Sequence, residues 1–193
     1  MKRIAVINQK GGVGKTTTTV NLGAALANRG GRVLLLDMDP QANLTVHVDK
    51  RPDLESHTLT SLLVEDTPLK DLVQSTGQAN LFVVPSDTSL AGVEQVLANR
   101  IGRETILREA LDVFPDAANF DYILFDCPPS LGVLSANALV AADWVVIPMQ
   151  AEYLSLQGMA KLLEVIQLVQ KRLNPALKIA CVLPCMVDAR TNL

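Results

Sequence analysis

The stretch NQKGGVGKTT, from Asn8 to Thr17, decides the fold of this chain. Its glycine-rich turn ends in Gly-Lys-Thr, the part of a phosphate-binding loop that carries the chemistry. In such a loop backbone N–H groups wrap the phosphates, the lysine reaches the β/γ oxygens and the threonine ligates Mg²⁺. The pattern predicts these roles for Gly14, Lys15 and Thr16.

The loop departs from the strict motif at one position and carries a second lysine. The pattern G-x-x-x-x-G-K-[ST] asks for a glycine where this chain has Gln9. Lys10 follows, directly before the glycines that let the backbone approach a phosphate. We expect nucleotide contacts from the whole loop: Gly11, Gly12, Val13, Gly14, Lys15, Thr16 and Thr17.

Outward from the loop, runs of aliphatic residues alternate with helical patterns. The runs are nearly continuous rather than alternating, which is typical of strands buried on both faces. They begin at Arg3, Arg32, Leu81, Tyr122, Trp144 and Lys178. The i, i+3, i+4 spacing of apolar residues predicts helices over 155–173 and 88–114, the second with a weak point at Gly102. Residues 40–80 read as surface loops and short helices.

This alternation predicts the fold class: an α/β, P-loop NTPase-like domain with a mostly parallel central sheet and helices on both faces. The length of 193 residues suits a single domain over 1–193. The run from Lys178 to Val187 reads as a central strand, yet only six residues follow it. We therefore expect the chain to lack a C-terminal part.

Three carboxylates follow strands of the predicted sheet. Asp37 and Asp39 come after the second run, and Asp126 ends the fourth. Because ligands bind beyond the carboxyl ends of parallel strands, we expect all three near Lys15 and Thr16. Asp126 has the form of a Walker B aspartate that holds Mg²⁺, and one of the other two can face the γ-phosphate side and orient water. The alternatives are helix capping by Asp126 and turn chemistry before Pro40.

Composition limits the partners of the chain. Lys and Arg number 17 against 20 Asp and Glu, a formal net charge of −3, so any DNA contact must come from a local patch or from the symmetry of an oligomer. No apolar run approaches the roughly 20 residues that span a bilayer, so we expect a soluble cytoplasmic protein. His47 and His57 lie in polar sequence and receive no role.

Five motifs resemble, in order and spacing, those of ParA-type chromosome and plasmid partition ATPases, the deviant-Walker branch of P-loop proteins: KGGVGKTT, LLLDMDPQAN, YILFDCPPSLG, VIPMQAEYLSLQGM and MVDARTNL. The resemblance implies a slow ATPase with ATP and Mg²⁺ as cofactors. It implies an ATP-dependent homodimer that binds DNA nonspecifically on the nucleoid and is reset when a ParB-like partner stimulates hydrolysis. It also implies that the family's C-terminal elements are missing after Leu193.

The resemblance also implies roles for single residues. Lys10 matches the signature lysine that reaches the partner subunit's nucleotide, as a trans-acting arginine finger does. Asp39 looks like the residue that positions the hydrolytic water, while Asp37 and Asp126 look like the carboxylates on the Mg²⁺ side. Arg190 matches a position that contacts DNA. Gln150 and Glu152 match a stretch on the dimer rim and receive no firm role.

Three other functions stay open at this point. A membrane-associated positioning ATPase similar to MinD would need an amphipathic C-terminal helix, which this chain does not show. A small-molecule kinase or ligase would explain Lys15, Thr16 and Asp126 but would leave Lys10 without a task. A noncatalytic or dominant-negative nucleotide-binding fragment would fit the short chain.

Overall fold

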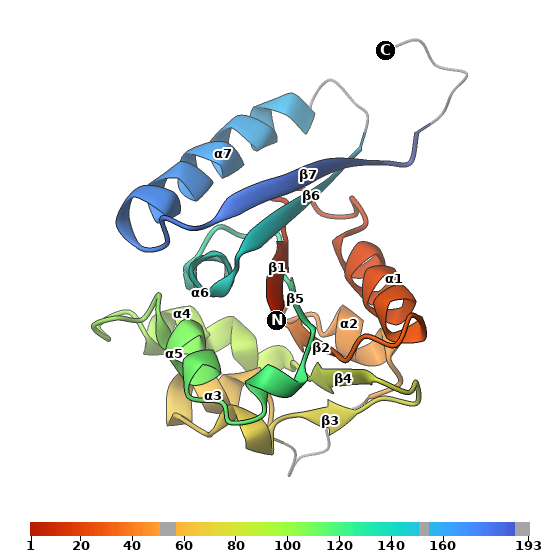
Figure 1. Cartoon of the computed structure of the whole chain (residues 1–193). Coiled ribbons are helices and arrows are strands. Elements are labelled where there is room, and N and C mark those ends of the chain that lie inside the picture. The colour runs from red at the N-terminus through yellow and green to blue at the C-terminus, as the bar shows by residue number, and fades with distance from the viewer. Residues whose placement is uncertain (51–56, 151–154, 188–193) are drawn as a thin grey trace.

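A computed structural model describes residues 1–50, 57–150 and 155–187. In this part of the chain seven strands form one sheet, in the spatial order β3-β4-β2-β5-β1-β6-β7 (Figure 1). Their bounds are β1 Lys2–Val6, β2 Val33–Asp37, β3 Gln74–Ser75, β4 Leu81–Val84, β5 Tyr122–Asp126, β6 Trp144–Gln150 and β7 Lys178–Cys185. Every neighbouring pair is parallel except β3 and β4, which are antiparallel. The predicted mostly parallel α/β fold is confirmed.

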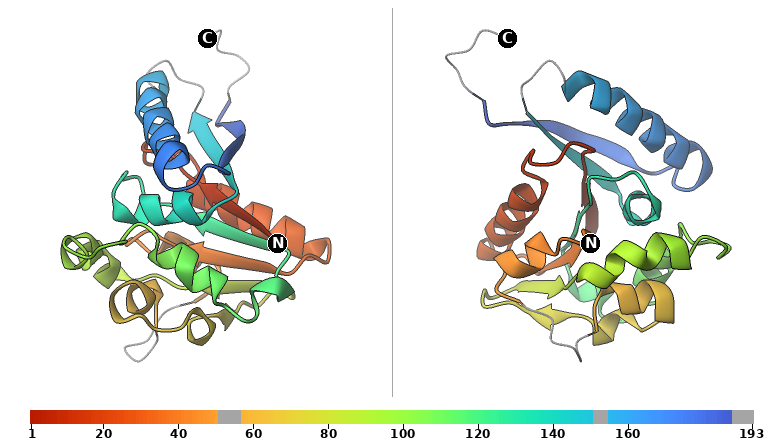
Figure 2. Two further views of the ribbon diagram at one scale, coloured as in Figure 1. Left: turned by 60° about the vertical axis from the view of Figure 1, so that its left-hand side comes forward. Right: turned by 180° about the vertical axis from the view of Figure 1, so that it is seen from behind.

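Helices cover both faces of the sheet (Figure 2). On one face lie α1 (Lys15–Asn28) and α2 (Asn43–His47). The other helices are α3 Leu59–Glu65, α4 Val93–Val96, α5 Ile106–Asp112, α6 Val133–Ala141 and α7 Ser155–Arg172, with short 3-10 turns η1 Leu69–Asp71, η2 Thr88–Gly92 and η3 Ala117–Asn119. Among the described helices none combines the length and the hydrophobicity needed to cross a membrane.

Strand β2 shows why the sheet needs helices on both of its faces. Its residues are all fully buried, and successive side chains point to opposite faces. Leu34 and Leu36 belong to the larger apolar cluster under α3 to α7, whereas Val33 and Leu35 belong to the smaller cluster under α1 and α2. A continuous aliphatic run therefore supplies two cores, as the sequence predicted.

The single helix predicted over 88–114 is wrong, because η2, α4 and α5 divide this segment. Gly102 lies between α4 and α5 with φ +73°, a left-handed conformation that interrupts a helix. Leu90, Leu97 and Leu107 are nonetheless all buried. The apolar spacing therefore predicted which residues face the core, but it did not predict whether they lie in one helix or in several.

The run from Lys178 to Val187 was expected to form a central strand, and among the described residues β7 forms the edge of the sheet, beside β6. Ile179 is 40% exposed and Val182 is 42% exposed. Aliphatic composition indicated strand, but it does not distinguish an edge from a centre. The sequence also gave no sign of β3, whose two residues, Gln74 and Ser75, are polar.

Candidate active site

The glycine-rich loop connects the end of β1 to the start of α1 (Figure 1). Gly12 and Gly14 have φ of +72° and +91°, which side chains other than glycine rarely adopt. A Cβ at Gly12 would meet nothing within 4 Å, so the inner side of this turn is open. Asn8 anchors the loop, since its amide donates to the Pro148 carbonyl at 2.7 Å and its oxygen accepts from the Lys10 N–H at 3.1 Å.

Lys15 is the buried cation of the loop, with 8% of its surface exposed. Its ammonium donates to the Lys10 carbonyl at 3.2 Å. Burial lowers the pKa of Lys15, and the negative charges of Asp126 and Asp39 oppose that shift. A partly desolvated lysine in a glycine-rich loop is suited to bind an anion such as a phosphate.

Asp126 and Thr16 meet beside this lysine. Asp126 ends β5, and its Oδ2 accepts from the Thr16 hydroxyl at 2.7 Å, while Oδ1 accepts from the Thr19 hydroxyl at 3.2 Å. Burial raises the pKa of Asp126 to about 7, and the hydrogen bonds from both threonines act against the shift. A carboxylate and a hydroxyl in contact are the oxygen ligands that Mg²⁺ prefers, so this pair fits a magnesium ion.

The other two carboxylates differ in their surroundings. Asp37 is fully buried, and both of its oxygens accept hydrogen bonds from the protein, from Asp39 N–H and from Thr45. Burial raises the pKa of Asp37. Asp39 instead lines an open hollow, and its Oδ1 accepts from the Gln41 N–H at 3.0 Å. The metal role predicted for Asp37 stays a prediction.

The hollow has a volume of about 400 Å³ and lies between the loop, α2 and the end of β7. Loop residues Gly11, Gly12, Gly14, Lys15, Thr16 and Thr17 line it with Asp39, Gln41, Asn43, His47, Pro129 and Met186. The sequence analysis assigned no role to five of these residues: Gln41, Asn43, His47, Pro129 and Met186. His47 had a usable signal, because it follows Asn43 by four residues and so shares its helix face, where its Nδ1 contacts the Asn43 carbonyl.

Lys10 accepts from the Lys15 ammonium through its carbonyl, but its own side chain contacts the end of β6. It is not among the residues that line the hollow, and its ammonium donates to the Gln150 side chain at the end of β6, at 2.7 Å. Gln150 in turn donates to the Met186 sulfur at 3.0 Å. The ammonium groups of the two lysines therefore contact different partners, Gln150 for Lys10 and the Lys10 carbonyl for Lys15. Arg190 and Glu152 lie outside the described residues.

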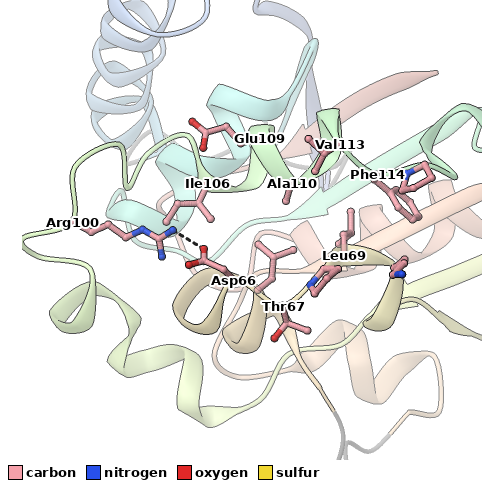
Figure 3. Close-up of a pocket in the computed structure, with 13 residues that line it drawn as sticks. Asp66, Thr67, Leu69, Arg100, Ile106, Glu109, Ala110, Val113 and Phe114 are labelled. Carbon is pink, nitrogen blue, oxygen red and sulfur yellow. Dashed lines mark hydrogen bonds and ion pairs between the residues drawn. The ribbon is translucent and has the colours of Figure 1, made fainter.

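A second hollow, of about 430 Å³, lies between α3 and α5 (Figure 3). Its walls are largely apolar, with Leu69, Ile106 and Phe114 among them, and the Arg100–Asp66 ion pair of 2.6 Å lies at its rim. None of the predicted nucleotide-binding residues lines it. We therefore place the functional site at the glycine-rich loop.

Comparison with known proteins identifies the family of this chain. A family model described as an AAA domain matches residues 1–179. Over 193 residues the chain is 51% identical to the sporulation initiation inhibitor protein Soj of Bacillus subtilis, and the match covers all of this chain and 75% of Soj. It is 47% identical to the chromosome partitioning protein ParA of Myxococcus xanthus, over 98% of this chain and 66% of that protein. The chain belongs to the ParA/Soj family of partition ATPases.

The fold of this ParA/Soj family member also matches solved structures. One is described as cobyrinic acid a,c-diamide synthase from Mycobacterium smegmatis with a bound ATP analogue and magnesium. Its TM-score is 0.92 at 42% identity, and the match covers 99% of this chain and 78% of that one. A plasmid partition protein from Borrelia burgdorferi also matches, with a TM-score of 0.86 at 26% identity over 100% of this chain and 83% of that one. The described sheet and its helices therefore have the fold of ParA-like P-loop NTPases.

Proposed function

We propose that this protein is an ATP-driven partition switch with ATP and Mg²⁺ as its cofactors. The contrast between the two loop lysines carries the proposal. Lys15 lies within its own hollow, whereas Lys10 is held outside it by Gln150. In a dimer the Lys10 ammonium would exchange its contacts within this chain, Gln150 among them, for the nucleotide of the second subunit, where it neutralises γ-phosphate charge as an arginine finger does. ATP then becomes the condition for a homodimer.

The other residues divide the remaining tasks. Gly11 to Thr17 bind the phosphates, and Thr16 with Asp126 holds Mg²⁺, which supplies charge neutralisation when bound. Asp39 orients the attacking water from its place in the hollow. Asp37 contributes negative charge on the same side of the site.

DNA and a partner protein complete the cycle. The ATP-bound dimer binds DNA nonspecifically through basic positions that include Arg190, and a ParB-like activator stimulates slow hydrolysis, which releases the dimer. The name of the relative from Myxococcus xanthus supports chromosome partition as the process. The nucleoid, in the cytoplasm, is the corresponding site of action.

The test is binding of the full chain to a fluorescent random-sequence duplex with Mg²⁺ and ATP, ADP or no nucleotide. We expect an anisotropy increase with ATP only, which Lys15→Ala abolishes and Lys70→Ala, a change of an exposed lysine at the second hollow, leaves unchanged. Equal binding under all three conditions would contradict an ATP-controlled switch.

The name of the Mycobacterium smegmatis structure favours a second candidate, an ATP-using synthase that converts carboxylic acid groups to amides. Such an enzyme uses Lys15 and Asp126 in the same way but needs no lysine in trans. Full nucleotide turnover by Lys10→Ala, together with loss of turnover in Lys15→Ala, would favour this candidate.

A further inference from the structure

Three buried polar residues meet behind Asp39, on the side away from the hollow. Asp37 ends β2, Thr45 lies in α2, and Ser86 follows β4. Each has a relative exposure of 0%, and neither Thr45 nor Ser86 lines the hollow. Polar groups buried this deeply are costly unless they are hydrogen-bonded, so their partners indicate what the cluster does.

Thr45 joins the other two members of the cluster. Its hydroxyl donates to Asp37 Oδ2 at 2.7 Å, and its backbone N–H donates to the same oxygen at 2.9 Å. The hydroxyl also accepts from the Ser86 N–H at 3.0 Å. A threonine hydroxyl has one proton and can accept as well, so this position uses both of its capacities.

The cluster holds the backbone of Asp39 at both ends. The Asp39 N–H donates to Asp37 Oδ1 at 3.2 Å, and the Asp39 carbonyl accepts from the Ser86 hydroxyl at 2.8 Å. That carbonyl also accepts from the Ala42 N–H at 2.9 Å. The side chain of Asp39 lines the hollow, where its Oδ1 accepts from the Gln41 N–H.

We propose that Thr45 and Ser86 are positioning residues that fix the Asp39 carboxylate for water activation, with Asp37 as their buried anchor. This inference rests on the proposed ATPase function. A displacement of a catalytic group by 1 Å can lower a rate about 100-fold. Because Thr45 and Ser86 do not reach the hollow, their loss affects hydrolysis rather than nucleotide binding.

The experiment compares ATP affinity with single-turnover hydrolysis in the full chain. Thr45→Val removes the hydroxyl but keeps the shape, and Thr45→Ser keeps the hydroxyl. We expect Thr45→Val to slow hydrolysis about 10- to 100-fold and Thr45→Ser to stay within about threefold of the wild type. In both variants ATP affinity should change by less than about twofold, since the phosphate-binding loop is untouched.

Ser86→Ala keeps the proposal testable if Thr45→Val fails to fold. It removes only the hydroxyl donated to the Asp39 carbonyl, which retains the Ala42 N–H, and we expect hydrolysis to slow about 3- to 10-fold. Ser89→Ala is the matched control, because Ser89 is exposed and bonds to Asp87 and Thr60 rather than to Asp39. Its rate should equal that of the wild type.

Two results would overturn the positioning role alone: wild-type hydrolysis in folded Ser86→Ala, or a loss of ATP affinity as large as the loss of rate. A wild-type chain that binds ATP but never hydrolyses it, with DNA and activator present, would overturn the proposed function and this inference together. The wild-type measurement thus separates the two failures.

Discussion

At the scale of single residues, the buried charges next to the loop determine what the site can do. Lys15 and Asp126 are nearly enclosed, and burial shifts the pKa of each toward the neutral form. Asp37, also buried, adds a negative charge that raises the pKa of Asp126 further. Without Mg²⁺ and nucleotide the site therefore lowers the stability of the fold whenever its carboxylates are ionised.

This arrangement predicts that the Mg²⁺-free protein becomes less stable as the pH rises. Burial raises the pKa of Asp126 from 3.8 to about 7. Between these values the folded chain holds a proton that the unfolded chain has released, so the stabilising contribution is complete below about pH 4 and is lost as the pH passes about 7. The free energy of unfolding of the wild type, measured with urea in a chelator, should fall across this range by more than about 1 kcal/mol relative to Asp126→Asn. Parallel profiles for the two proteins would contradict the prediction.

The sequence predicted the residues of the site better than their contacts. Lys15, Thr16, Asp39 and Asp126 meet as expected, because a phosphate-binding loop and the carboxyl ends of parallel strands share one edge. The hydrogen bonds of Asp37 to Thr45 were beyond prediction, since they depend on how α2 packs after the turn that follows β2. The contact of Lys10 with Gln150 joins positions 140 residues apart, and sequence patterns are local.

At the scale of elements, α1 packs closely on the sheet next to the site. Gly23 faces β2, where an added Cβ would stand 2.7 Å from the Leu35 Cδ2. Glycine is a poor helix former, so its presence in the middle of α1 allows the close approach that brings the start of the helix to the loop. On α7, by contrast, a Cβ at Gly158 would meet nothing within 4 Å.

The two glycines should therefore respond to alanine with opposite signs. In either helix alanine gains up to about 1 kcal/mol of helix propensity. At Gly23 the overpacking against Leu35 costs about 1–3 kcal/mol, so Gly23→Ala should lower the free energy of unfolding. Gly158→Ala should raise it by up to about 1 kcal/mol. Urea unfolding of both variants checks the contrast, which would be refuted if Gly23→Ala were as stable as Gly158→Ala.

Local sequence predicted the boundaries of an element only where it contained a clear signal, such as the proline that follows α7. The helix predicted over 155–173 is confirmed as α7, which ends at Arg172, shortly before Pro175. The division of 88–114 was missed because both arrangements bury the same apolar residues. The edge position of β7 depends on which strands lie beside it, and that is a property of the whole sheet.

At the scale of the whole molecule, the described chain presents one ATP-binding edge with a lysine at its rim. The six parallel strands bring their carboxyl ends to this edge, and Lys10 is held there by Gln150 at the end of β6. Under the proposed function, a second copy completes the site, which would explain why one short loop carries two lysines. Nucleotide binding, dimerisation and DNA binding would then form one linked equilibrium.

The molar mass in solution, measured by light scattering with Mg²⁺ and either ATP or ADP, tests this claim most directly. We predict that the wild type is a dimer with ATP and a monomer with ADP. Asp39→Ala should strengthen the ATP dimer because hydrolysis no longer resets it, and Lys10→Ala should remain monomeric while still binding ATP. A monomer in every condition, or an ATP dimer that survives Lys10→Ala unchanged, would contradict a lysine that acts in trans.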